Sequence, residues 1–330
     1  MDAGPIPESR VNHGRLHRFL FEGLPVRGAL VRLGADWREA LVRRAKLGAF
    51  PAPVRALLGE MTAAGVLMQS SIKFDGALVL QIHGDGPVKL AVAEVRADFG
   101  FRTTAKIVAD IDDEADLVAL INPGGGARCA ITLDPRDRAP GVQAYQGVVP
   151  LYDDSRRPLS RLSEVLEHYM LQSEQLDTRL VLAANDEIAA GLLLQRMPVT
   201  GSGNLDGRAN EERIGRDEDF ERIALLGATL TRDELLSLDE DTILRRLFWE
   251  ERLRRFEPQY TRFHCSCSSE RVHAMLIGLG RAEMDSLIAE RELVEVGCDF
   301  CGQQFRFDAV DIGRLFTPAR DLPPTTRTRQ

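Results

Sequence analysis

The spacing of apolar residues in the first 200 positions predicts both strands and helices. Apolar residues alternate with polar or small ones over residues 26–33, where arginines interleave with the apolar side chains, and over residues 72–82 and 88–92. Alternation with a period of two is typical of strands, and Gly84-Asp85-Gly86-Pro87 predicts a tight turn between two of them. Residues 53–68 and 159–171 instead carry apolar side chains at intervals of three or four, which predicts amphipathic helices.

The predicted strands and helices come in blocks rather than in strict alternation. Further strands are predicted at residues 130–133, 146–150, 179–184 and 191–197, and the last two are expected to close the sheet. Such blocks favour an α+β fold over a doubly wound parallel sheet. We therefore expect residues 1–199 to form one core domain of mixed sheet and helix.

Residues 200–260 differ in composition and are predicted to form a charged helical linker. Glycines scattered among polar residues at 200–217 are typical of a connecting segment, and 25 of the 54 residues from 204 to 257 are charged, against 28% of the whole chain. Helical spacing of apolar residues nevertheless persists from Phe220 to Phe248, and Thr231 with Glu234 forms a capping-box pattern. Helices with so thin an apolar stripe are marginal in isolation, so their stability is expected to depend on docking.

The charge of the chain and the lack of long apolar runs narrow the classes of function. A formal net charge of -8 over 330 residues argues against nucleic acid and anionic membrane surfaces as partners. No stretch has the apolar character of a secretory signal or a membrane span, so a cytoplasmic location is expected. In that reducing compartment, paired cysteines are more often metal ligands or redox-active thiols than a permanent disulfide framework.

Four of the five cysteines lie in one short C-terminal stretch, as Cys265-Ser266-Cys267 and Cys298-Asp299-Phe300-Cys301. Two closely spaced thiol pairs can make a tetrahedral sulfur cage, and zinc is the metal that such a cage favours. A single spacer in the first pair is unusual for a structural zinc site. The four cysteines are therefore predicted to be metal ligands that double as a thiol switch, while the spacing alone leaves a purely structural zinc site equally open.

The segment that carries these cysteines is too short to fold on apolar burial alone. The roughly 50 residues from 262 to 312 belong to a size class in which one core rarely supplies more than ~3–5 kcal/mol. Structural zinc supplies an apparent ~10–16 kcal/mol in small metal-folded peptides. Zinc is thus expected to decide whether residues 262–312 fold, with Gly302 at a positive backbone angle. The tail after residue 318 is expected to be disordered.

With these cysteines in place, the chain resembles the thirty-three-kilodalton heat-shock protein family, the redox-regulated bacterial holdase chaperones. The resemblance extends over residues 15–316, and the similar segments follow in the family's order. These segments are Leu16-His17-Arg18-Phe19-Leu20-Phe21-Glu22, Val26-Arg27-Gly28, Lys73-Phe74-Asp75-Gly76, Gly84-Asp85-Gly86-Pro87, Tyr145-Gln146-Gly147-Val148-Val149, Ser173-Glu174-Gln175-Leu176 and Gln195-Arg196-Met197-Pro198.

The resemblance implies a core domain at residues 1–199, a metastable linker at 200–260 and a zinc-binding redox switch at 261–330. It implies that one zinc ion is held by Cys265, Cys267, Cys298 and Cys301 in an inactive, reduced state. On oxidation, disulfides would form as Cys265–Cys267 and Cys298–Cys301, zinc would leave and the linker would unfold. The protein, often as a homodimer, would then bind unfolded client proteins without ATP, and it would not be an enzyme.

The same residues are also open to other interpretations. One alternative is a thiol-disulfide oxidoreductase that uses Cys298 and Cys301, which is disfavoured because no βαβ pattern surrounds that pair. Another alternative is a zinc-ribbon binding module without switching. His264 or His273 could replace a thiolate ligand, although four cysteines already suffice. Cys129 is expected to be a small core residue, and residues 122–126, rich in glycine, are expected to form a flexible loop rather than a phosphate site.

Overall fold

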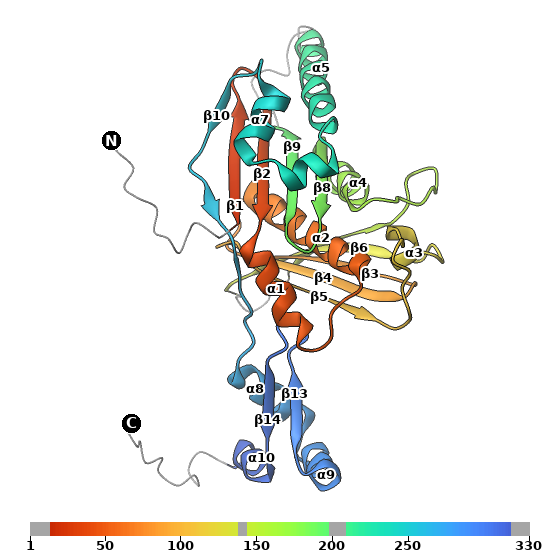
Figure 1. Cartoon of the computed structure of the whole chain (residues 1–330), viewed down its shortest axis with the longest axis vertical. Coiled ribbons are helices and arrows are strands. Elements are labelled where there is room, and N and C mark those ends of the chain that lie inside the picture. The colour runs from red at the N-terminus through yellow and green to blue at the C-terminus, as the bar shows by residue number, and fades with distance from the viewer. Residues whose placement is uncertain (1–13, 138–143, 198–208, 318–330) are drawn as a thin grey trace, which may run out of the picture. The chain divides into compact units, whose positions relative to one another are not determined.

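A long helix, α2 (Ala52–Ser71), lies between two β-sheets and organises the larger part of the chain (Figure 1). The structure is a computed structural model that describes residues 14–137, 144–197 and 209–317, with only the backbone for 209–217. The chain divides into two compact units, Met1–His264 and Cys265–Gln330. Within the described ranges, no helix combines the length and apolar character needed to cross a membrane.

The first sheet is antiparallel, with strand order β10-β1-β2-β9-β8 and with β11 also paired to β1. Its strands are β1 (Arg15–Phe21), β2 (Val26–Leu33), β8 (Thr178–Ala184), β9 (Ala189–Arg196), β10 (Leu253–Arg255) and β11 (Gln259–Tyr260). Two of these strands, β10 and β11, come from the region predicted to be a helical linker. That prediction was wrong for these residues because their backbone hydrogen bonds pair with β1, more than 230 positions earlier in the chain.

The second sheet has strand order β12-β5-β4-β3-β6-β7, antiparallel except for the parallel pair of β12 and β5. Its strands are β3 (Gly76–His83), β4 (Val88–Arg96), β5 (Gly100–Ile107), β6 (Arg128–Pro135), β7 (Tyr145–Pro150) and β12 (Arg262–Phe263). The predicted hairpin around residues 84–87 is confirmed as β3–β4. Residues 179–184 and 191–197 were expected to close a single sheet, and the single sheet was wrong: β8 and β9 join β2 in the first sheet, whereas the strands between residues 76 and 150 form the second. The α+β class is confirmed.

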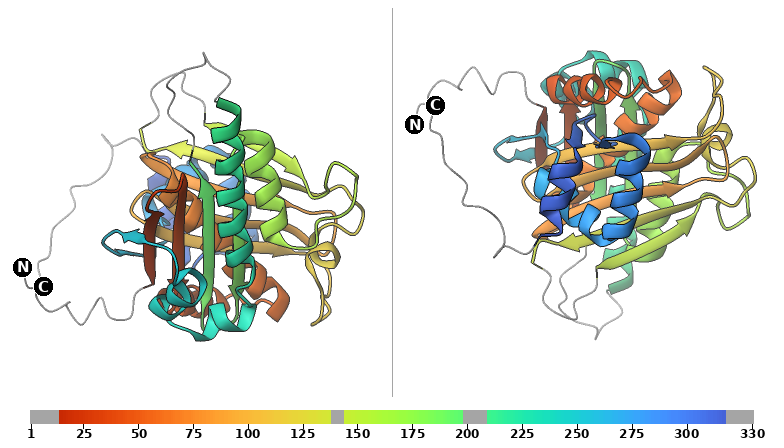
Figure 2. Two further views of the ribbon diagram at one scale, coloured as in Figure 1. Left: turned by 90° about the horizontal axis from the view of Figure 1, so that it is seen from above. Right: turned by 90° about the horizontal axis from the view of Figure 1, so that it is seen from below.

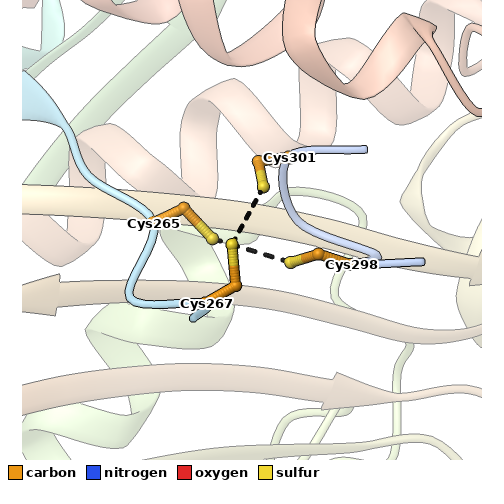
Figure 3. Close-up of side chains that lie close together, drawn as sticks. All are labelled: Cys265, Cys267, Cys298 and Cys301. Carbon is orange, nitrogen blue, oxygen red and sulfur yellow. Dashed lines mark hydrogen bonds between the residues drawn. The ribbon is translucent and has the colours of Figure 1, made fainter. Parts of the chain in front are cut away.

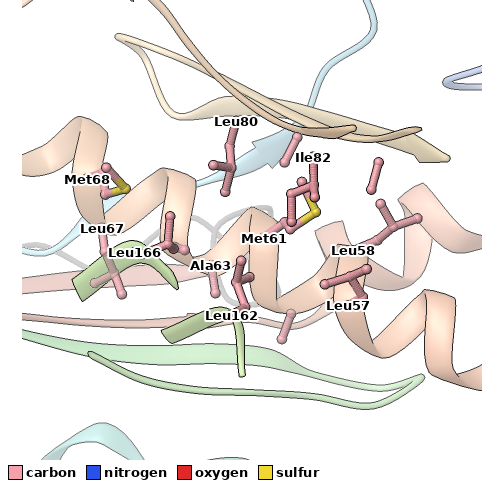
Figure 4. Packing of buried hydrophobic residues seen from close by; sticks show 14 of the residues in the cluster. Leu57, Leu58, Met61, Ala63, Leu67, Met68, Leu80, Ile82, Leu162 and Leu166 are labelled. Carbon is pink, nitrogen blue, oxygen red and sulfur yellow. The ribbon is translucent and has the colours of Figure 1, made fainter. Parts of the chain in front are cut away.

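Helix α2 is buried on nearly every side, which the predicted stripe of an amphipathic helix understates. Thirteen of its twenty residues are buried, and its side chains meet Leu80 and Ile82 of β3 as well as Leu162 and Leu166 of α4 (Leu162–Glu174) (Figure 4). Gly59 permits the close approach of the first sheet, since an added Cβ would lie 2.4 Å from the Cβ of Ala184. The remaining helices of this core are α1 (Ala35–Ala45) and α3 (Leu117–Ile121).

The first sheet is apolar on both faces. Successive residues of β9 enter different clusters: Leu193 packs in the α2 core, whereas Leu192 and Leu194 pack in a second cluster with helices from the predicted linker. Those helices are α5 (Ala209–Ala228), α6 (Arg232–Ser237) and α7 (Glu240–Phe248), and they cover the face opposite α2 (Figures 1 and 2). The linker helices therefore depend on the sheet for most of their apolar burial.

Aromatic and aliphatic side chains make up the contact between the linker helices and the sheet. The ring centroids of Phe21 on β1 and Phe248 on α7 are 5.0 Å apart in an edge-to-face arrangement. Leu235, Ile243 and Leu244 are buried in the same cluster. The capping box at α6 is confirmed, since Glu234 accepts a hydrogen bond from the Thr231 amide and Thr231 Oγ1 accepts one from the Glu234 amide.

The glycine-rich connection is shorter than the predicted segment of residues 200–217. The backbone is helical from residue 209, and residues 200–208 lie outside the described part of the chain, as does the tail after residue 317. The proposed division at residues 199 and 260 therefore stays a prediction.

A short strap joins the two sheets just before the cysteine unit. The strap consists of β11, Thr261 and β12, so its first strand pairs with the first sheet and its second with the second sheet. Thr261 is 1% exposed and its hydroxyl donates to the buried carboxylate of Asp36, whose pKa is raised by burial. The amide of His264 donates to the Phe101 carbonyl oxygen at 2.8 Å. The chain is thus fixed to the core up to the residue before Cys265.

Residues 122–126 form a loop, as expected, and specific hydrogen bonds hold it. The Asp85 carboxylate accepts from the amides of Gly124 at 3.1 Å and Gly126 at 2.6 Å. Asn122 Oδ1 accepts from the Ala127 amide at 3.0 Å. These acceptors occupy the amides that a phosphate cradle would need.

The second unit is small and has a core of six buried apolar residues. Its elements are α8 (Ser269–Leu279), α9 (Arg281–Arg291), β13 (Val294–Gly297), β14 (Gln304–Phe307) and α10 (Ala309–Leu315). The strands β13 and β14 form an antiparallel hairpin. The buried apolar residues are Val272, Leu276, Met284, Val294, Phe307 and Ile312. So small a core leaves this unit short of stabilisation from apolar burial.

Glu60 of α2 gives the first unit a dependence of stability on pH that can be measured. Burial raises the pKa of Glu60 from 4.5 to about 7, and the neighbouring Arg232 guanidinium only partly opposes this effect. The folded protein therefore binds this proton more tightly than the unfolded chain. The resulting stabilisation is present below about pH 4.5 and is lost as the pH rises through about 7. Replacing the carboxyl by a neutral amide should remove that loss.

We expect the free energy of unfolding of Glu60→Gln, relative to the unmodified protein, to rise by about 1–3 kcal/mol between pH 5 and pH 8. Urea denaturation of the first unit, followed at both pH values, measures the difference. Glu39→Gln, which removes an exposed carboxylate on α1, is the control. A difference that does not change with pH would contradict the prediction.

Candidate metal centre

The first cysteine pair lies in the connection between β12 and α8. Cys265 follows His264 directly, and Cys267 precedes Ser268, whose side chain caps α8 by accepting from the Arg271 amide. The Arg271 guanidinium reaches back and donates to Ser266 Oγ at 2.7 Å. The helix start therefore holds the loop between the two cysteines in a defined conformation.

The second pair lies in the turn of the β13–β14 hairpin. The amides of Cys301 and Gly302 donate to the Cys298 carbonyl oxygen at 3.3 and 2.8 Å, and the Cys298 amide donates to the Gln303 carbonyl oxygen at 2.9 Å. Gly302 has a φ of 69°, as the sequence predicted, because the turn needs a residue that tolerates the left-handed region. The neighbouring backbone amides of Cys301 and Phe300 act to lower the pKa of Cys298. These amides favour the thiolate form of Cys298, but the hydrogen bond with Cys265 and burial act in the opposite direction and outweigh them.

The four sulfur atoms form one cluster (Figure 3). All lie within 4.8 Å of one another, with Cys265 Sγ 3.6 Å from Cys298 Sγ and Cys267 Sγ 3.4 Å from Cys301 Sγ. Four thiolates around one zinc ion at Zn–S distances near 2.3 Å would lie about 3.8 Å apart. The donor set and the spacing therefore fit a tetrahedral zinc ion.

Electrostatics make a cation necessary if these thiols are to be charged. The hydrogen bond with Cys265, together with burial, raises the pKa of Cys298 to about 12, and burial raises the pKa of Cys267 to about 11. Several negative charges within a few ångströms repel one another unless a positive ion lies among them. A divalent metal would reverse this effect and hold the sulfurs as thiolates.

The other candidate residues are not part of the cluster. The five cysteines are all free thiols, and Cys129 is fully buried in the core on β6, where desolvation raises its pKa to about 12. The expectation of a small core residue is confirmed for Cys129. His264 Nε2 lies 2.7 Å from Arg96 Nη1, while His273 Nε2 lies 3.2 Å from Ser269 Oγ and its ring contacts Phe307. Neither histidine joins the four sulfurs in the group of candidate ligands.

Sequence reasoning missed the side chains that support the cysteines, namely Arg271 and Ser266. Their contact depends on how α8 begins, and an arginine six positions after a cysteine gives no signal of it. The hairpin around Cys298 and Cys301 also bears on the oxidoreductase alternative. A thioredoxin-like pair begins a helix within a βαβ unit, whereas this pair lies in an antiparallel turn.

Comparison with known proteins gives the family. The model of the Hsp33 protein family matches residues 14–308 of this chain. The chain belongs to the Hsp33 family. It is 46% identical over 306 residues to the 33 kDa chaperonin of Chromobacterium violaceum, which covers 92% of this chain and 94% of that protein. It is 40% identical over 312 residues to the 33 kDa chaperonin of Methylobacillus flagellatus, with 93% and 96% covered.

A solved structure shows the same fold. The crystal structure of the 33 kDa chaperonin of Thermotoga maritima superimposes with a TM-score of 0.74 at 20% identity, covering 92% of this chain and 97% of that chain. The resemblance inferred from the sequence is confirmed. Membership of the Hsp33 family, and the name chaperonin that its relatives carry, support a chaperone function for this chain.

The cluster predicts a metal stoichiometry that single substitutions should change. We expect the reduced protein to carry about one zinc ion per chain, and Cys267→Ser and Cys298→Ser to lose at least about a hundredfold in zinc affinity, roughly 3 kcal/mol. Competition with a chromogenic chelator measures the affinity, and elemental analysis gives the stoichiometry. The control is Cys129→Ala, which alters a thiol outside the cluster. Equal retention of zinc by all three variants would show that the four sulfurs are not the ligands.

Proposed function

We propose that this protein is a redox-regulated, ATP-independent holdase chaperone that is inactive when reduced and zinc-bound. Cys265, Cys267, Cys298 and Cys301 hold one zinc ion in the resting state. Oxidation releases the metal, the linker helices leave the first sheet, and unfolding client proteins bind. The observation that carries the proposal is the four-sulfur cluster in a unit whose described residues form an apolar core of only six buried side chains.

The proposed redox step is a thiol oxidation within each near-neighbour pair. Cys265 with Cys267, and Cys298 with Cys301, each form an S–S bond as two electrons pass to an oxidant such as hypochlorite or peroxide, which is reduced. Each disulfide closes a loop of three or four residues and returns only about 1.5–2 kcal/mol by the chain-entropy estimate. The metal supplies several times more. Oxidation therefore removes more stabilisation from the second unit than it restores.

The linker helices are the part of the first unit suited to a conformational response. Twenty-five of the 54 residues from 204 to 257 are charged, and most of the described apolar residues of α5–α7 are buried or half-buried against one face of the first sheet. If the helices leave, the sheet exposes Phe19, Phe21, Leu192 and Leu194. An exposed apolar face of this kind would bind the apolar segments of unfolding proteins. Association of two oxidised chains through the same face would give the expected homodimer.

Oxidation should change metal content and chaperone activity together. We expect hypochlorite treatment at mild heat to release zinc, consume four thiols per chain and suppress aggregation of an unfolding client such as citrate synthase. Light scattering, a chromogenic zinc indicator and thiol titration measure the three quantities. Equal suppression by the reduced, zinc-loaded protein would sink the switch. Reduction of insulin by the zinc-bound form would instead support an oxidoreductase.

A charge placed between α7 and the first sheet should activate the protein without oxidation. Leu244 is 3% exposed, so Leu244→Asp would bury a carboxylate without a partner and should weaken docking by at least about 2 kcal/mol. We expect the reduced variant to keep its zinc and to suppress client aggregation. Arg245→Asp, at the adjacent exposed position, is the matched control. Equal suppression of client aggregation by the two reduced variants would show that docking of α7 does not restrain activity.

A further inference from the structure

Two arginines join the short helix α6 to the core, one at each end and in opposite directions. Arg32 extends from β2 of the core to the carboxyl end of α6, and Arg232 extends from the first residue of α6 to the core. Helix α6 has only six residues, too few to persist without tertiary contacts. The side chains that fix its two ends are therefore decisive for whether it stays on the sheet.

Arg32 donates to three main-chain carbonyl oxygens of the linker. Its Nη1 lies 3.0 Å from the Leu235 oxygen and 2.7 Å from the Leu238 oxygen, and its Nη2 lies 2.8 Å from the Leu236 oxygen. Carbonyl groups at the end of a helix have no partner within the helix, and the helix dipole makes this end negative. The planar guanidinium thus satisfies the end of α6 in a way that a single ammonium cannot.

Docking of the linker offsets the unfavourable burial of the Arg32 guanidinium in the core. Burial lowers the pKa of Arg32, while Glu240 and Asp239 at the start of α7 act in the opposite direction. The half-buried guanidinium is therefore stabilised by groups that all belong to the linker. Leu235, in the same turn of α6, is buried in the apolar cluster between linker and sheet.

Arg232 makes the reciprocal contact at the amino end of α6. Its Nη1 lies 3.2 Å from Glu60 Oε1 on α2, and its Nη2 donates to the Ala184 carbonyl oxygen on β8. A cation in the first turn of a helix is opposed by the dipole, so its contact with the core must offset that effect. The Arg232 side chain is 50% exposed and borders a cavity of about 680 Å³. Water can therefore replace its partners more easily than those of Arg32.

We propose that Arg32 and Arg232 form a clasp on α6, and that Arg32, as its stronger half, sets how readily the linker leaves the first sheet. Arg32 is a positioning residue, since it acts through the backbone of α6. Its acceptors are all main-chain oxygens, so the contact needs the fork geometry of arginine rather than a particular linker sequence. The link from this clasp to chaperone activity rests on the proposed function, but the clasp itself does not.

Hydrogen exchange in the reduced, zinc-loaded full chain tests the clasp directly. We expect amides of residues 233–238 to exchange about tenfold faster in Arg32→Lys, which keeps the charge, and in Arg32→Gln. Arg232→Gln should give an increase of about threefold, because its contacts are more exposed. The matched control is Arg245→Gln, at an exposed position on α7, for which we expect exchange within about twofold of the unmodified protein.

The same experiment separates the clasp from a general loss of stability. Unchanged exchange in α2 and unchanged zinc content, together with faster exchange in α6, support the clasp. Wild-type exchange of α6 in both Arg32 variants would overturn it. Equally faster hydrogen exchange in α2 and α6 would also overturn it, since Arg32 would then be an ordinary core residue. If the Arg32 variants do not fold, Arg232→Gln, at a more exposed site, provides an independent test.

Activity then distinguishes this proposal from the proposed function. If both hold, Arg32→Lys suppresses client aggregation while zinc is bound and needs less oxidant than the unmodified protein for full activity. Suppose that α6 exchanges faster in the Arg32 variants, but that the unmodified protein is equally active when reduced and when oxidised. The clasp would then be upheld and the redox switch refuted. If exchange of α6 is unchanged in both Arg32 variants, the clasp is refuted whatever their chaperone activity.

Discussion

The contact between helices α5–α7 and the first sheet is the interaction on which the rest of this structure depends. The sheet is apolar on both faces, and only one of them is covered by α2. The charge-dense helices in turn find their apolar contacts on the other face. Because each partner lacks an alternative way to bury its apolar residues, the two are stable together and exposed apart. In the described structure the contact therefore keeps the apolar residues of both partners away from water.

The two units draw on different sources of stability. The first unit has a large core around α2, packed closely enough that Gly59 must lack a side chain. The second unit has six buried apolar residues and four sulfurs directed at one point. Apolar burial changes little with redox conditions, whereas thiolate ligands are lost on oxidation. An oxidant can therefore act on one unit without attacking the core of the other.

The strap of β11, Thr261 and β12 lies just before the point in the chain where the first unit ends and the second begins. It pairs with both sheets, and its last hydrogen bond is made by the residue before Cys265. The segment just upstream contains β10, which pairs with β1 and follows the linker helices in sequence. The buried hydrogen bond between Thr261 and Asp36 holds the strap to the first unit, so the chain that leads to the cysteine unit is fixed at this point.

Local patterns in the sequence determined the features that rest on neighbouring residues. The helix at 53–68, the hairpin around residues 84–87, the capping box at Thr231 and the knuckle turn at Gly302 were predictable, because period, turn chemistry and capping act within a few positions. The four candidate ligands were likewise predictable, because cysteine spacing is itself the signal.

Tertiary structure alone decided the features that depend on distant residues. Nothing local indicated that β10 and β11 would pair with β1, that the strands would divide into two sheets, or that Glu60 would lie partly buried beside Arg232. Arg32 was visible as an arginine within an apolar strand, but its role depends on carbonyl groups more than 200 positions away. Strand pairing and the burial of charge are set by which surfaces meet in space, and the order of residues along one strand or helix does not contain that information.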